Sequence, residues 1–386
     1  MSAQRTARLL ALAALVAWPW LNLPTSFLGD ANTAGIYFLA GVSIVLLTGW
    51  VGQISLAQAS FVGIGAYVTA MAARSLHLGF PLNLLVGAAA AGLIAAVLGL
   101  VALRVRGLYL AVATLIFAWV ADGYLFTASW MGGTGGSTSA PVNVVGAEGE
   151  FPFIDFANRR TFYYVVLAAC AAAVFAMVNL RDSKVGRAFF AVRGSEIAAA
   201  SFGVDVVRTK LAAFATAGVV AGAAGALLVV HQGSVVADQF NLTASLFYLS
   251  VAVVGGLGSL GGAAAAAVVF AGLNQVFFRV EAFAGYLEVV SAFLLAGVLL
   301  AYPGGLAALG VAGSIRFQRH VKPRLDVLTD KLGERLSVLW AARPRRRADP
   351  PYPDQGRDPT GVPVVEAASD SMEAAALEAK EGRADV

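Results

Sequence analysis

The sequence predicts an all-α fold: a polytopic transmembrane helical bundle of about ten spans, with both termini in the cytoplasm. Of the 386 residues, 59% are hydrophobic and 13% are charged, whereas a soluble domain has about 45–50% apolar and about 25% charged residues. Apolar runs long enough to cross a bilayer, which takes roughly 20 residues, recur along the chain. They lack the alternation of strands, which favours helices. This composition excludes a soluble enzyme and a disordered chain.

The predicted spans follow one another over residues 1–302. Arg5 and Arg8 precede the first apolar run, which leaves a signal peptide as an alternative to a first membrane helix. We favour the helix because Pro19 interrupts the run and no clear cleavage site follows. The region 242–279 allows more than one division into spans. The spans are expected at 9–28, 33–51, 54–73, 82–103, 108–128, 161–180, 210–231, 242–258, 261–279 and 285–302.

The distribution of Lys and Arg predicts the orientation. With the N-terminus inside, the inner connecting segments before residue 303 carry ten of these residues and the outer segments carry four. Basic residues concentrate in cytoplasmic loops. The excess therefore places both termini in the cytoplasm and favours an even number of spans. The net charge of +4 is then an orientation signal and does not indicate a nucleic-acid partner.

The connections and the C-terminal part divide the chain further. The outer loop 129–160 and the inner segment 181–210 are the two long connections before residue 303. Residues 303–342 form a cytoplasmic juxtamembrane segment, which we expect to be either an amphipathic helix at the inner surface or a solvated linker. Residues 343–386 are rich in Pro, Ala, Asp and Glu without an apolar period, so a disordered cytoplasmic tail is expected.

Polar side chains inside the predicted spans are candidates for lining a translocation path. Ser55 and Gln58 share one face of the expected helix 54–73 at i, i+3 spacing. Polar groups at membrane depth face either other helices or a cavity, so helix–helix hydrogen bonding is an equal alternative for each of them. The candidates are Ser55, Gln58, Tyr67, Asp122 and Asn274.

Several glycines are expected to let helices or turns pack closely. Two of them form a G-x-x-x-G spacing in the span 210–231, which is typical of a helix-packing face. Three others lie in VGGLGSLGG, which predicts a tight turn, a broken helix or close packing. The expected packing glycines are Gly63, Gly65, Gly218, Gly222, Gly225, Gly255, Gly256 and Gly258.

The inner segment 181–210 is the longest polar stretch before residue 303. Within it, Ala188–Ser201 is expected to form one short helix between Gly186 and Gly203. Arg193 and Glu196 are three residues apart, so they can meet on one face of such a helix. A polar helix held between two spans is suited to docking a soluble partner. A solvated loop is the alternative, although most connections are shorter than this one.

No catalytic constellation is present in the sequence. The three histidines lie far apart and there is one cysteine, Cys170, so neither a metal site nor a disulfide is supported. The chain also lacks the G-x-x-x-x-G-K-[ST] loop that binds nucleotide phosphates. We therefore expect a protein that is not an enzyme, holds no cofactor or metal, and works in transport, conduction or scaffolding.

The motifs resemble those of the LivH/LivM family, the membrane permeases of branched-chain amino acid ABC importers, and its LivM-like branch best. The matching stretches are SLAQASFVGIGAY at 55–67, GRAFFAVRGSEIAAASFGVDVVRTKLAAF at 186–214, AGAAGAL at 221–227, GGLGSLGG at 255–262 and YPGGLAAL at 302–309. The second stretch is the most specific. In this family it looks like the cytoplasmic segment that couples the permease to its ATPase.

The resemblance implies a transmembrane permease domain over 1–302 in a bacterial inner membrane. It implies a second related permease, two cytoplasmic ATPases that hold the ATP and Mg, and a periplasmic solute-binding protein. The residues implied in ATPase coupling are Gly186, Arg187, Arg193, Glu196 and Gly203. Permeases of the family for urea or short amides stay open as alternatives. A secondary transporter working alone is a rival class, but it usually places carboxylates deep in the membrane.

Overall fold

A computed structural model describes residues 25–76, 81–102, 107–128 and 159–279, together with the single residues 19, 293, 297 and 306. The chain forms two compact units, 1–318 and 319–386, and every described residue belongs to the first. The expected spans 9–28 and 285–302 therefore lie almost wholly outside the described residues. So do nearly all of the outer loop and the whole of the segments 303–342 and 343–386, apart from residue 306.

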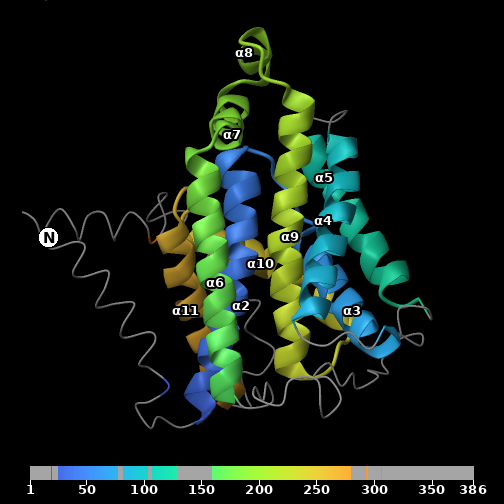
Figure 1. The fold of residues 1–386 in the computed structure, drawn as a ribbon, viewed down its shortest axis with the longest axis vertical. Helices are drawn as coiled ribbons and strands as arrows, with labels where there is room; N and C mark the ends of the chain where they lie inside the picture. Colours follow the sequence, from blue (N-terminus) through green and yellow to red (C-terminus); the bar gives the residue numbers. More distant parts are fainter. Residues whose placement is uncertain are drawn as a thin grey trace, which may run out of the picture. The chain divides into compact units, whose positions relative to one another are not determined.

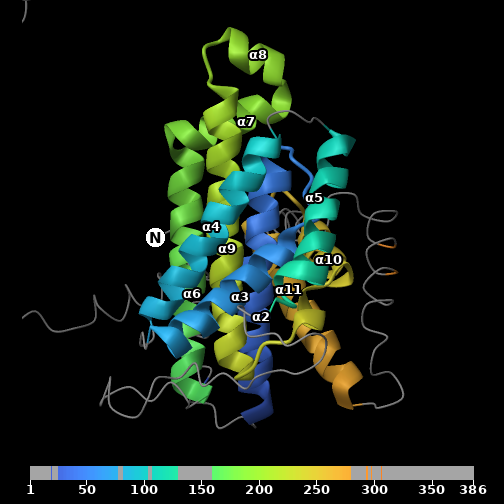
Figure 2. The ribbon, with the colours of Figure 1, turned by 90° about the vertical axis from the view of Figure 1, so that its right-hand side faces the viewer.

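The described part of the chain is helical, which confirms the all-α class (Figures 1 and 2). Two π-turns and one 3-10 turn interrupt or join the α-helices. The elements are α2 (Thr25–Ile44), η2 (Val45–Trp50), α3 (Gln58–Ser75), α4 (Leu82–Ala102), α5 (Leu108–Val120), η3 (Ala121–Leu125), α6 (Arg159–Asp182), α7 (Lys184–Gly194), α8 (Glu196–Ser201), α9 (Val206–Gln232), η5 (Ala237–Phe240), α10 (Leu242–Gly255) and α11 (Leu260–Arg279).

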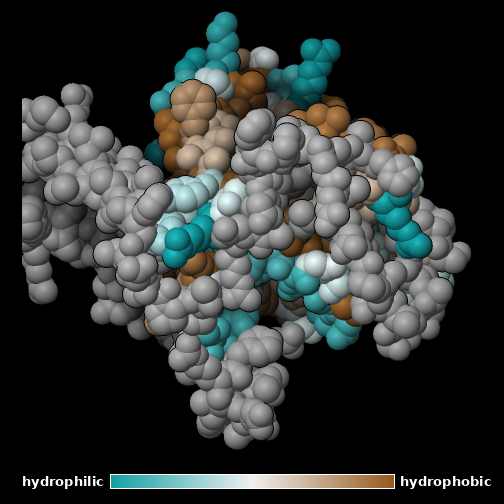
Figure 3. Space-filling model, turned by 60° about the horizontal axis from the view of Figure 1, so that its bottom comes forward, coloured by the Kyte–Doolittle hydropathy of each residue, from teal (hydrophilic) through white to brown (hydrophobic). Residues whose placement is uncertain are grey.

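Four helical stretches within the described residues are long and apolar enough to cross a membrane: Phe27–Trp50, Leu82–Val101, Arg160–Asp182 and Val206–Gln232. Large apolar side chains also lie on the outside of the bundle. Figure 3 shows hydrophobic surface, in brown, beside hydrophilic residues on the described part. On α4, for example, Leu93 and Val97 are exposed. A surface of this kind suits lipid or another subunit better than water.

Helix α2 contacts α6, α10 and α11, which form one group of helices with it. It also contacts α9, which belongs to a second group. Its side chains Ile36, Leu39 and Ile44 are buried in the core. The second group is formed by α3, α4 and α9, which pack against one another. The core is therefore continuous from α11 to α4 through α2 and α9.

Small residues bring α3, α4 and α9 together. A Cβ atom at Gly218 or Gly222 of α9 would collide with Ala95 or Ala91 of α4. A Cβ at Gly225 would collide with the backbone carbonyl of Val62 in α3. Because glycine has no side chain, the helices approach until their backbones touch, which maximises van der Waals contact. We call this contact of α9 with α3 and α4 the glycine seam.

Candidate functional site

The inner segment begins with a sharp corner between α6 and α7. Ser183 starts α7, and its Oγ accepts a hydrogen bond from the Gly186 N–H at 3.1 Å. Such a cap satisfies one of the unpaired donors at a helix start. A side chain at Gly186 would collide with the Leu180 carbonyl of α6. The corner thus requires glycine at this position for close approach, and it holds α7 directly against the end of α6.

Two helices, α7 and α8, stand where one helix over Ala188–Ser201 was expected. The break falls at Ser195, which has an extended backbone (φ −164°, ψ 121°) and whose Oγ accepts from the Ala198 N–H at 3.3 Å. Serine competes for backbone hydrogen bonds in this way and so favours the start of a new helix. Arg193 and Glu196 consequently belong to different helices. Figures 1 and 2 both show α7 and α8 at one end of the bundle.

The segment returns to the bundle through a left-handed residue and a capped helix start. Gly203 follows α8 with φ +81°, a conformation that favours glycine. Asp205 then caps α9, with its Oδ1 accepting from the Arg208 N–H at 3.0 Å. Its carboxylate also pairs with the exposed Arg208 side chain at 3.1 Å. This turn places Lys210 on the first turns of α9, opposite α8.

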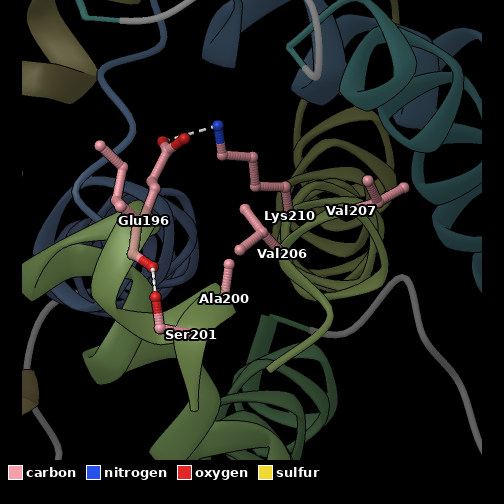
Figure 4. Close-up of a pocket in the computed structure, with 7 residues that line it drawn as sticks. Glu196, Ala200, Ser201, Val206, Val207 and Lys210 are labelled. Atoms are coloured by element: carbon pink, nitrogen blue, oxygen red, sulfur yellow. Dashed lines mark hydrogen bonds and ion pairs between the residues drawn. The ribbon is translucent and has the colours of Figure 1, made fainter. Parts of the chain in front are cut away.

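Glu196 and Lys210 form an ion pair between α8 and α9, with 2.6 Å between Oε1 and Nζ (Figure 4). The Lys210 side chain is 2% exposed and that of Glu196 is 21% exposed. Burying a charged ammonium is costly unless a counter-charge accompanies it, so Glu196 is the partner that allows Lys210 to be buried. The pair borders a cavity of about 560 Å³, which is otherwise lined by Ile197, Ala200, Ser201, Val206 and Val207.

Arg193 and Glu196 also reach the end of the first described span. The Arg193 guanidinium Nη1 donates to the Gly49 carbonyl. The Gln53 amide Nε2 donates to Glu196 Oε1 at 3.4 Å. The rings of Trp50 and Phe190 add an aromatic contact, with centroids 5.8 Å apart. The two short helices are thus tied to residues 49–53 by three separate side-chain contacts.

Residues 51–57 are not helical, which corrects the expectation that Ser55 and Gln58 share a helix face. Gly52 has φ +75°, and the α3 helix begins only at Gln58. Ser55 lies in the non-helical stretch, where its Oγ accepts from the Ala57 N–H at 3.3 Å. The left-handed glycine ends the regular helix, and local serine bonding replaces helix bonds. We call residues 49–57 the junction.

The junction runs from the Trp50 end of the first described span back into the bundle. Gln58, which directly follows the junction, accepts a hydrogen bond from Ser43 of α2 at 3.1 Å. Ser43 stands about seven residues before Trp50, which is roughly 10 Å at 1.5 Å per residue. The Ala59 N–H bonds Ser245 of α10 at 3.1 Å, again well inside the bundle. Helix α3 therefore begins inside the bundle and not at the level of the Trp50 end of α2.

The junction has one buried face and one exposed face. Val51, Gln53, Ser55 and Ala57 are buried, as alternate residues of an extended chain can be. Ile54 between them is 46% exposed. Irregular backbone at membrane depth is tolerated where protein or a water-filled cavity covers it. The exposed face of the junction is therefore expected to lie against another protein surface or a water-filled cavity.

The five path candidates lie in different surroundings. Ser55 and Gln58 are buried, and the Gln58 Nε2 has no hydrogen-bond partner among the described residues. Tyr67 is buried in an aromatic cluster, where its ring stacks on Phe126 with centroids 5.2 Å apart. Asp122 is half-buried in η3. Asn274 of α11 donates to the Tyr37 hydroxyl of α2 at 2.9 Å, which is an interhelical contact. These positions do not show whether the five residues line a translocation path, so their role in the path stays a prediction.

The other expected residues are placed as follows. Arg187 is exposed on α7 and donates to the Asp182 carbonyl at 3.0 Å. Gly63 and Gly65 lie where α3 meets Phe240 and Gly222. Gly255 abuts the Ala263 backbone and Gly256 has φ +99° at the turn after α10, while Gly258 faces open space. The turn predicted at VGGLGSLGG is therefore the connection between α10 and α11.

Sequence reasoning missed Gly49, Gly52, Gln53 and the role of Lys210. Two signals could have found these residues. Gly49 and Gly52 flank Trp50 and Val51 in TGWVGQ, and paired glycines mark turns. A lysine at the start of a 27-residue apolar helix is also unusual enough to call for a carboxylate partner. The partner, Glu196, could not be chosen from the sequence because the turn between them sets the distance.

The fold defines the class of protein: an all-α membrane bundle with a short polar helix pair at one end. The chain belongs to the family of the branched-chain amino acid transport system permease component, which it matches over residues 26–303. It is similar to the "High-affinity branched-chain amino acid transport system permease protein LivM" of Salmonella typhimurium, with 33% identity over 270 residues. The match covers 64% of this chain and 62% of that relative.

The protein of the same name from Escherichia coli is also 33% identical, over 269 residues, with the same coverage of both chains. The chain thus matches a little less than two thirds of the length of these curated relatives. No solved structure matches the chain.

Proposed function

We propose that the chain is the permease subunit of an ABC importer in a bacterial inner membrane, carrying branched-chain amino acids or related solutes. The observation that supports this most is the family match over residues 26–303, which includes α2 to α11. The names of the two relatives support the solute class. In this role a periplasmic binding protein delivers the solute to the outer side and two cytoplasmic ATPases drive the transport.

Two exposed surfaces of the chain support the proposed partners. The α7–α8 pair stands at the end of the bundle that the excess of basic residues assigns to the cytoplasm, so it is the docking site for an ATPase. Exposed Ile197 and Phe202 offer apolar contacts there. The exposed face of the junction, with Ile54, would be covered by the second permease. The path would then run where the two permeases meet.

ATP-driven uptake tests this proposal. The complex with its ATPases, second permease and binding protein would be reconstituted in proteoliposomes, and uptake of radiolabelled leucine, urea and acetamide compared. Leucine uptake that needs ATP inside the liposomes supports the proposal. Uptake that continues without ATP and collapses with an ionophore would instead assign the chain to the secondary transporters. Uptake of urea or acetamide but not leucine would change the solute class.

A further inference from the structure

We propose that the junction carries the movement of the coupling helices α7 and α8 to the start of α3, with Arg193 and Glu196 as positioning residues of this link. The proposal rests on the proposed function, because it assumes an ATPase that moves α7 and α8. It differs from the expectation that these two side chains meet the ATPase. Their polar atoms bond the chain's own membrane part, through Gly49 and Gln53.

The contacts hold the junction from both short helices. Arg193 comes from the end of α7 and Glu196 from the start of α8, and they bond residues on either side of Gly52. The backbone at Gly52 itself lies against Arg193, since a Cβ there would come within 3.2 Å of the Arg193 Cγ. Neither helix can therefore shift without moving residues 49–53 or breaking these contacts.

The far side of the junction is also restrained. A Cβ at Gly49 would collide with the Leu257 carbonyl in the turn between α10 and α11. Residues 49–53 thus lie between that turn and the coupling helices. The buried ion pair of Glu196 with Lys210 fixes the position of the carboxylate that receives the Gln53 amide. A displacement of α8 would consequently be passed to the junction backbone.

Beyond Gln53 the chain can move without unpacking a helix. Residues 54–56 lie outside the helices, and Ala57 contributes only its carbonyl to α3, where it accepts from the Phe61 N–H at 3.1 Å. Single side-chain hydrogen bonds join this stretch to its neighbours. The Leu56 N–H bonds Thr114 of α5 at 3.0 Å, and Ser43 of α2 bonds Gln58 at 3.1 Å. Contacts of this kind can exchange one by one, unlike a close-packed core. Ser55 and the first residue of α3, Gln58, therefore form the part of the bundle that a moving junction would shift first.

A reversible covalent link tests the proposal. A Cβ at position 52 would lie 3.7 Å from the Arg193 Cβ, within the range of about 3.5–4.5 Å that a disulfide needs. The variant combines Gly52→Cys and Arg193→Cys in a Cys170→Ala background, assembled into the whole transport complex. Uptake and the stimulation of ATP hydrolysis by loaded binding protein are measured after reduction and after complete oxidation.

We expect both quantities to be low in the reduced variant, because the Arg193 contact with Gly49 is gone. Oxidation should raise both by roughly fivefold or more, the scale of a typical coupling between sites, because the disulfide replaces the lost link. Complete cross-linking without any gain would overturn the proposal. So would a further fall on oxidation, since it would show that α7 and the junction must separate during transport.

Controls separate the link from other effects. The Cys170→Ala complex and each single-cysteine variant receive the same oxidant and should show no change. If the double variant does not assemble, Gln53→Leu removes the bond to Glu196 while keeping the side-chain size, and it should lose the stimulation by loaded binding protein. Full stimulation in Gln53→Leu would overturn the proposal. ATP-driven uptake by the unmodified complex reports on the proposed function separately.

Discussion

The glycine seam and the junction are both built around glycines, but the glycines serve opposite purposes. In the seam, Gly218, Gly222 and Gly225 lie within a continuous helix and let backbones touch. In the junction, Gly52 has a positive φ and ends regular structure. Around the seam the contacts are steric and apolar, whereas hydrogen bonds and one aromatic contact hold the junction to α7 and α8.

The difference shows which part of the bundle can change shape. A close-packed helix contact has one good arrangement, because any shift opens gaps or creates overlaps. A non-helical stretch held by a few polar contacts can exchange them at small cost. We therefore regard the glycine seam of α9 with α3 and α4 as the fixed frame, and the junction together with the start of α3 as the moving part. The variants below alter the seam or the ion pair beside the junction, or lie outside both regions.

The largest effect is expected from Gly225→Ala in the seam. The added methyl group would overlap the Val62 carbonyl of α3, and backbone cannot rotate away as a side chain can. Overpacking usually costs about 1–3 kcal/mol, and this contact lies at the top of that range. The detergent-solubilised variant should unfold at a clearly lower temperature than the parent.

Gly272→Ala is the matched control for the seam. This glycine lies in α11 with open space around it, so alanine should leave stability unchanged or raise it by about 0.5–1 kcal/mol. Equal melting temperatures for the two alanine variants would contradict the steric account of the seam.

A smaller loss is expected from Lys210→Ala. Removing one partner of a fully buried ion pair costs about 3–5 kcal/mol, and the partial exposure of Glu196 should reduce this to roughly 2 kcal/mol. Arg208→Ala removes the exposed partner of Asp205 two residues away. Exposed pairs contribute about 0–1 kcal/mol. Thermal unfolding should rank the variants in that order, and the opposite order would show that the buried pair does not hold α8.

Tyr37→Phe should have a still smaller effect. It removes the hydroxyl that accepts from Asn274 but keeps the ring that contacts Phe247 edge-on at 5.0 Å. Interhelical hydrogen bonds in membranes contribute about 0.6 kcal/mol on average. The unfolding temperature should fall slightly, and that of Tyr124→Phe, an exposed tyrosine, should not. A large fall in both would point to a general effect of tyrosine removal.

Truncation after Gly313 should have the smallest effect of all. The family match ends at residue 303, and both the seam and the junction lie before it. Leucine uptake by cells that make the shortened chain should equal that of cells making the full chain at the same protein level. Complete loss of uptake at an equal protein level would mean that the C-terminal part takes part in transport.

Composition and periodicity predicted the all-α class and the positions of most described helices. The expected segments 82–103 and 161–180 correspond to α4 and α6 within a few residues. Such helices follow from the apolar content of the chain alone, because a long apolar segment in lipid must satisfy its own backbone. Apolar content does not show where a helix breaks, so the sequence predicted a helix from residue 54 although α3 begins at Gln58.

The candidate site was predicted as a segment but not as a set of contacts. The polar stretch 181–210 stands out from its apolar surroundings, and the role of its charged residues in ATPase coupling stays a prediction. Their partners depend on the break at Ser195 and on the turn at Gly203. These turns decide that Glu196 meets Lys210 and that Arg193 meets Gly49. No periodicity of one sequence encodes a contact over such a separation.

The central claim is that α7 and α8 act on the membrane part through the junction, and Arg193→Ala tests it most directly. In the reconstituted complex, we expect ATP hydrolysis without binding protein to continue, while stimulation by loaded binding protein and leucine uptake fall together by roughly tenfold. Coupling between two sites is reciprocal, so both should be lost. Arg208→Ala, as the control, should retain both. Full stimulation and uptake in a well-assembled Arg193→Ala complex would contradict the claim.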